Sequence, residues 1–311
     1  MPRAIPAIAV GTLALLALAP ASHAASFDCA KAATKVEKAI CADPGLSRAD
    51  SDMAAAYRAA LAVTPTPASL RAEQREWVKE MSLEASDLKA VYETRIATLK
   101  DVVTAGREAR RPVEIATLAS RCVPVRGSPA CKVTESGKIS LGVGAPWLWQ
   151  HQSMSDGDLT TGEAMVVLRP AADGRTATAV VWTADESAFY GSPDLVQSPS
   201  GPLLEIQGHL DGTGNLNAGA VFRVVGAGLK EIDSSSWIAA MDKRLPAGLE
   251  VWKGVYIDFK TLTAATPLWR PNDGNCCATG GRADLTVKIV GDAVVLDQLK
   301  VTRGAKAAAG F

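Results

Sequence analysis

The pattern of hydrophobic and polar positions changes near residue 107. Before this point, apolar residues recur every three or four positions, as in helices buried on one face. Met53, Tyr57 and Leu61 form one such stripe. After it, short runs of β-branched residues alternate with turns of Gly, Pro, Asp and Asn, which is typical of strands. We therefore expect an α+β protein in two domains, with the helices first.

Three helices are expected within residues 25–106. Thr34 and Glu37 form a capping box, which marks the start of a short first helix. A second helix is expected over residues 47–61, and a proline loop follows it. The third and longest helix is expected over residues 69–106, capped by its first serine. The second and third helices would form an antiparallel hairpin, partly covered by the first. The apolar face of the third helix comprises Leu70, Trp77, Met81, Leu88, Tyr92, Ile96, Leu99 and Val103.

A charged linker, residues 107–112, leads to a β-rich domain over residues 113–303. Its short strands predict an antiparallel sandwich or barrel. Residues 291–292, Gly-Asp, indicate a tight hairpin turn, and residues 237–244 a short helix. The Ala/Gly-rich tail, residues 304–311, is expected to fray. The expected strands are residues 138–143, 164–169, 176–183, 203–207, 220–225, 250–259, 283–290 and 293–301.

The first 24 residues predict a signal peptide. A basic residue precedes an uncharged apolar run, residues 5–18, and the pattern Ser22-x-Ala24 suits cleavage. The run is shorter than the roughly 20 residues that a membrane-spanning helix needs, and no later segment reaches that length. We therefore expect a periplasmic or secreted protein without a membrane span.

Composition narrows the possible functions. The chain has 311 residues, which suggests about two domains. Its 33 Lys and Arg balance 33 Asp and Glu, and 48% of its residues are hydrophobic. This composition excludes a disordered protein. It also argues against a nucleic-acid binder, which needs excess positive charge to displace phosphate counterions.

Six cysteines in an exported chain predict disulfides. Cys122 and Cys131 flank a Pro- and Gly-containing segment and are expected to staple a loop. Cys276 and Cys277 are adjacent. Either they bridge each other within a Gly-rich turn, or one or both pair elsewhere.

The helical part carries a recognisable set of residues. It comprises the stretch Ser26-Phe27-Asp28-Cys29, the stretch Val36-Glu37-Lys38-Ala39-Ile40-Cys41-Ala42-Asp43-Pro44, then Leu46, Asp50 and Tyr57, Gln74-Arg75-x-Trp77, and Tyr92-x-x-Arg95-Ile96-x-x-Leu99. Together they resemble the LprI-type lysozyme-inhibitor family over about residues 26–100. That family usually has a second cysteine pair in its long helix, at positions that correspond to about Glu84 and Asp87. Because that pair is missing as a unit, the resemblance implies that Cys29 and Cys41 bond to each other.

The resemblance implies a binding protein and not an enzyme, with lysozyme or peptidoglycan as the expected partner. A lysozyme cleft contains two carboxylates within a basic surface, so a blocker would offer cations or hydroxyls surrounded by acids. In the alternative interpretation of the candidate residues, Asp50 caps a helix, Trp77 packs in the core and Arg95 pairs with an acid. The candidate binding residues are Asp50, Tyr57, Arg75, Trp77 and Arg95.

The β-rich part offers weaker candidates. Its tryptophans could stack on sugars or fill the core, and we favour the core. The pattern Asp211-x-Thr213-x-Asn215-x-Asn217 favours a polar turn over a calcium loop, because carboxylates are too few. We expect no catalytic residue, cofactor or metal. An enzyme that acts on envelope polymers and a purely structural protein remain alternatives. The tryptophans are Trp147, Trp149, Trp182, Trp237, Trp252 and Trp269.

Overall fold

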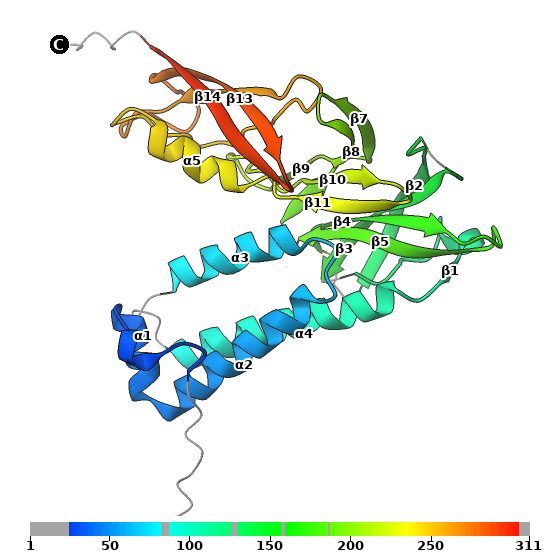
Figure 1. Cartoon of the computed structure of the whole chain (residues 1–311), viewed down its shortest axis with the longest axis horizontal. Coiled ribbons are helices and arrows are strands. Elements are labelled where there is room, and N and C mark those ends of the chain that lie inside the picture. The colour runs from blue at the N-terminus through cyan, green and yellow to red at the C-terminus, as the bar shows by residue number, and fades with distance from the viewer. Residues whose placement is uncertain are drawn as a thin grey trace, which may run out of the picture.

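A helical region precedes an antiparallel β-rich region in the computed structural model (Figure 1). Three parts of the sequence discussed above lie outside the described residues. They are the expected signal peptide, the tail after residue 304, and Glu84, one of the two positions that correspond to the family's second cysteine pair. Among the described helices, none is both long enough and apolar enough to cross a membrane. The structure describes residues 25–81, 87–125, 130–142, 144–156, 159–185 and 187–304.

The helical region starts with a disulfide-closed turn. The predicted capping box is present: the Thr34 hydroxyl accepts from the Glu37 amide, and the Glu37 carboxylate accepts from the Thr34 amide. A Cys29–Cys41 disulfide joins the turn before this box to the end of the helix after it, as the resemblance implied. The elements are η1 (Cys29–Lys31), α1 (Lys35–Ala42), α2 (Pro44–Leu61), α3 (Pro67–Glu80) and α4 (Leu88–Ala109).

The prediction of a single long helix over residues 69–106 is wrong, because the structure has two helices in this range. The first, α3, begins at Pro67 and ends at Glu80, and Met81 adopts an extended conformation. Asp87 then caps α4, since its side chain accepts a hydrogen bond from the Ala90 amide. Helix α4 continues to Ala109, so the first three residues of the expected linker are helical.

Helices α2 and α4 lie side by side and run in the same direction, whereas α3 runs the opposite way (Figure 1). Near their starts, the Tyr92 hydroxyl donates to Asp50. Near their ends, a Cβ atom on Gly106 would lie 2.8 Å from the Val63 side chain, so only glycine permits this approach. The expected antiparallel arrangement therefore holds for α2 and α3, but the close neighbour of α2 is α4.

The β-rich region contains three main antiparallel sheets. Their orders are β1-β5-β4-β3-β2, β11-β10-β8-β7 and β12-β13-β14, and β6 pairs with β9. The strands are β1 (Val113–Glu114), β2 (Ala130–Ile139), β3 (Trp147–Asp156), β4 (Leu159–Pro170), β5 (Thr176–Asp185), β6 (Ala188–Tyr190), β7 (Asp194–Ser198), β8 (Gly201–Ile206), β9 (Gly208–Leu210), β10 (Ala220–Val225), β11 (Gly228–Ile232), β12 (Thr263–Leu268), β13 (Gly281–Val290) and β14 (Ala293–Arg303).

The four-stranded sheet is buried on both faces. Adjacent residues of a strand point to opposite faces, and Leu203 and Leu204 of β8 lie in different core clusters. Leu204 packs with residues of the five-stranded sheet, including Trp149. Leu203 packs with the three-stranded sheet and with Trp237 of α5 (Ser236–Arg244), which confirms the expected short helix. The sheets therefore stack in three layers, an extension of the expected sandwich.

Two strand expectations need correction. Residues 250–259 do not form a strand, although their alternating burial imitates one: they make only isolated bridges, at Glu250 and Asp258. Burial alternates in any extended segment that packs on a core, so the pattern alone does not reveal a missing partner strand. Of the strand expected at residues 138–143, only residues 138 and 139 lie in a strand, at the end of β2, and residue 143 lies outside the described residues. The hairpin turn at residues 291–292 is confirmed, with Gly291 at φ 59°.

A carboxylate from the β-rich region holds the start of α3. Thr66, which precedes α3, makes no side-chain cap. Instead, the Glu231 carboxylate of β11 accepts from the amides of Ala68 (2.5 Å) and Ser69 (3.1 Å) and from the Ser69 hydroxyl (2.6 Å). The positive end of the helix dipole favours this negative charge. Ser69 was expected to cap the helix, but it lies within the first turn and donates to Glu231.

We predict that Glu231→Ala lowers the free energy of unfolding by about 1–3 kcal/mol, because it leaves the first amides of α3 without an acceptor. Urea denaturation measures this loss. Amide hydrogen exchange at Ala68 and Ser69 should accelerate as well. Glu231→Gln keeps one acceptor and should lose less. Equal stability of all three proteins would contradict the capping role.

The same carboxylate should give a pH dependence. Burial raises the pKa of Glu231 above its ordinary value of 4.5, and the bonds from Ser69 and Ala68 only partly oppose this. Between the unfolded and folded pKa values, the folded state therefore binds more protons than the unfolded state. The wild type should gain stability relative to Glu231→Gln as the pH falls from about 7 towards 4.5. Denaturation of both proteins across this range measures the difference, and a constant difference would contradict the prediction.

Candidate functional site

The predicted binding residue Asp50 lies inside the helical region, where it is 4% exposed. Its carboxylate accepts from the Ser26 amide (2.6 Å) and from the Tyr92 hydroxyl (3.1 Å). Burial, followed by the negative charge of Asp50, raises the pKa of the Tyr92 hydroxyl. Asp50 thus ties the N-terminal segment and α4 to α2.

Arg95 is the second predicted residue in this interior, at 5% exposure. It donates to Gln74 (2.9 Å) and to Glu73 (2.6 Å), both on α3. Its guanidinium carbon lies 6.0 Å from the ring centre of Trp77. The Trp77 ring in turn meets Tyr92 edge to face, at 5.3 Å. Polar and aromatic side chains therefore bridge α3 to α4.

The five predicted residues do not form one surface. The structure brings Asp50, Trp77 and Arg95 together in the interior, and Tyr57 is half-buried against the same core. Arg75 is exposed on α3. The binding role of these residues stays a prediction, and Arg75 is the one of the five with an exposed side chain.

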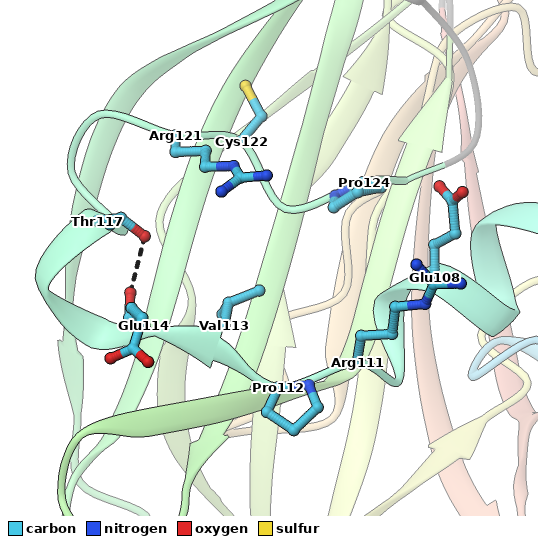
Figure 2. Close-up of a pocket in the computed structure, with 9 residues that line it drawn as sticks. All are labelled: Glu108, Arg111, Pro112, Val113, Glu114, Thr117, Arg121, Cys122 and Pro124. Carbon is cyan, nitrogen blue, oxygen red and sulfur yellow. Dashed lines mark hydrogen bonds between the residues drawn. The ribbon is translucent and has the colours of Figure 1, made fainter.

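A pocket of about 350 Å³ lies where α4 ends and the chain enters β1 (Figure 2). The sequence predicts only a linker over residues 107–112 and does not predict this pocket. The feature of the sequence that could have indicated this pocket is the run of charged residues just before Pro112. The lining residues are Glu108, Arg111, Pro112, Val113, Glu114, Thr117, Arg121, Cys122 and Pro124.

Charges of both signs line this pocket. The side chains of Arg111 and Arg121 come from different segments, one just after α4 and one after η2 (Ile115–Thr117) (Figure 2). Glu108 lies beside Arg111 and Glu114 lies near Thr117 (Figure 2), and all four charged residues are exposed. The turn between the segments is closed by a bond from the Thr117 hydroxyl to the Glu114 carbonyl (2.9 Å). The arrangement can present two cations, flanked by acids, to a negatively charged partner.

Residues 29–122 match the family model described as lysozyme inhibitor LprI. The helical region is thus similar to this family. The match confirms the resemblance and extends it past α4, through β1 and η2 to Cys122. The LprI match therefore contains every residue that lines the pocket except Pro124. No curated protein matches the chain.

The β-rich region fixes the last loop of the LprI-type region. The Gln150 side chain on β3 accepts from the Val123 amide (2.9 Å) and donates to the carbonyls of Leu118 and Arg121. Gln152 donates to the Val123 carbonyl (2.8 Å). Both glutamines are fully buried. The position of Arg121 is thus set by side chains from outside the matched segment.

The remaining cysteine expectations are resolved as well. A Cys122–Cys131 disulfide confirms the predicted staple and ties the pocket loop to β2. Cys276 and Cys277 bond to each other in an exposed turn, which settles the two alternatives.

The tryptophans of the β-rich region are mainly core residues, as favoured above. Trp252 is the exception: it is half-buried and stacks on Trp269, with ring centres 6.0 Å apart. The Asp211–Asn217 segment lies in a loop, and its Asn217 amide group bonds to the Val255 backbone. The buried tryptophans are Trp147, Trp149, Trp182, Trp237 and Trp269.

We predict that Gln150→Leu destabilises the protein by about 2–4 kcal/mol, because the buried Val123 amide, the Leu118 carbonyl and the partly buried Arg121 carbonyl lose their partners. Gln207→Leu is the matched control, since Gln207 is exposed and its replacement should change stability by less than about 0.5 kcal/mol. Denaturation of both variants tests this. Similar losses would show that the buried bonds of Gln150 contribute little.

Proposed function

We propose that this protein is an exported lysozyme inhibitor that contacts its target through the pocket at the end of α4. The observation that carries the proposal is the LprI match over residues 29–122, which contains nearly the whole pocket lining. The function therefore requires binding alone, without a catalytic step in this chain.

The charges of the pocket suit this target. A lysozyme cleft contains two carboxylates that act on the glycosidic bond. Arginine binds carboxylates through two parallel hydrogen bonds, so Arg111 and Arg121 are suitable groups to enter such a cleft. Glu108 and Glu114 would then face the basic surface around it. This arrangement, with cations that enter the cleft and acids that face its surroundings, is the one expected of a protein that blocks the cleft.

The three disulfides support an exported location. Disulfides persist in oxidising compartments such as the periplasm and the extracellular space. The predicted signal peptide supports the same location. We therefore propose that the protein encounters lysozyme in the periplasm or outside the cell.

The experiment titrates the purified protein, from residue 25 onward, into a lysozyme assay on cell walls. We expect inhibition at micromolar concentration. Arg111→Ala combined with Arg121→Ala should weaken inhibition at least about tenfold, because each arginine loses a charge-assisted bond. Lys243→Ala is the control, since it removes an exposed positive charge from α5. Full lysozyme activity at micromolar excess would contradict the proposed function.

A second variant tests which surface makes the contact. Arg75→Ala should leave inhibition unchanged if the pocket is the contact site. If Arg75→Ala weakens inhibition and the Arg111/Arg121 variant does not, the exposed face of α3 is the contact instead. Higher salt should weaken inhibition by the wild type, because exposed charges are screened.

A further inference from the structure

The three-stranded sheet carries an open groove of about 540 Å³ on its outer face. Along β13, Ala283, Leu285 and Val287 are buried in the core. Because side chains alternate along a strand, Asp284 and Thr286 point to the opposite face. That outer face is therefore polar at these positions.

The strand register places the polar residues in rows across the sheet. Paired residues on neighbouring strands lie side by side, so their side chains act together. One row is Thr263, Thr286 and Gln298, and the next is Ala265, Asp284 and Lys300. All six line the groove. They form a floor of hydroxyl, amide and charged groups.

Tyr256 forms part of the wall of this groove and is 46% exposed. Its hydroxyl donates to the Asn215 carbonyl (2.5 Å), so the ring is held in place. A fixed, exposed aromatic ring beside a polar floor offers a stacking surface together with hydrogen-bonding groups.

The floor has hydrogen-bonding capacity that the protein does not use. The hydroxyl oxygen of Thr286 is buried and has no partner within the described residues. Buried polar atoms without partners cost stability, so such an atom needs an explanation. Within the described chain, the side chains of Gln298 and Lys300 also make no hydrogen bond or ion pair. A ligand rich in hydroxyl groups would satisfy all three.

The charges and the backbone restrict the class of ligand. Asp258 and Asp284 balance Arg282 and Lys300, and Arg282 pairs with Asp284 at 2.7 Å. This balance does not favour a polyanion such as a nucleic acid, which needs excess positive charge. A peptide strand would need a free sheet edge, whereas the groove lies on a sheet face.

We propose that this groove binds an uncharged stretch of a glycan chain. The Tyr256 ring stacks on a sugar ring, and Thr286, Gln298 and Lys300 bond to its hydroxyl groups. The groove is open, so a chain can pass along it. This site is separate from the pocket at the end of α4, and it gives the β-rich region a binding role of its own.

The test is calorimetric titration of the protein with pentamers of N-acetylglucosamine and of glucose, together with co-sedimentation with purified peptidoglycan. The two pentamers distinguish a wall glycan from a glucan. Tyr256→Ala should weaken binding about tenfold, and Tyr256→Phe should retain it because the ring remains. Phe189→Ala, which removes a 36% exposed aromatic ring on β6, should have no effect.

Thr286→Val separates binding from folding. It preserves the side-chain shape and removes a hydroxyl without a protein partner, so thermal stability should stay equal or rise while glycan affinity falls. Absence of binding to both pentamers and to peptidoglycan would overturn the proposal. If both Tyr256→Ala and Thr286→Val bind glycan as tightly as the wild type, the glycan does not bind in this groove. Tyr256→Ala should keep its inhibition of lysozyme, so failure of this proposal is distinguishable from failure of the proposed function.

Discussion

The carboxylate of Glu231 holds the first turn of α3 from a strand more than 160 residues further along the chain. Helix starts carry amides without partners inside the helix, and α3 has no acceptor of its own before it. The β-rich region supplies that acceptor. Helix α3 then reaches α4 through the bonds of Arg95 to Gln74 and Glu73. The order of the helical region therefore depends on a charge that lies outside the LprI match.

The pocket at the end of α4 shows the same dependence. Its loop belongs to the LprI-type region, but Gln150 and Gln152 of β3 hold that loop in place. Several residues that carried the resemblance, such as Asp50 and Arg95, are buried and join the helices to one another. These residues of the family pattern therefore contribute to the fold.

Local features were predictable from the sequence because their partners are close in the chain. The capping box of Thr34 and the turn at Gly291 each depend on a few neighbouring residues. The break between α3 and α4 was missed because the apolar spacing continues across it. The Glu231 cap and the Gln150 bonds join distant segments, so no local pattern encodes them. The pocket was not predicted for the same reason, since Arg111 and Arg121 line one pocket only because β1 and η2 turn the chain between them.

The common direction of α2 and α4 has an electrostatic result. Two helices that run the same way bring the carbonyl-rich ends of both to one place, where their partial negative charges add. Arg110 follows α4 directly, and its guanidinium donates to the carbonyl of Ala62, the residue that directly follows α2. Arg107 and Arg111 stand on either side of it in the chain. The basic residues between the two regions thus offset the partial negative charges at the ends of both helices. The same run of residues includes Arg111, which lines the pocket.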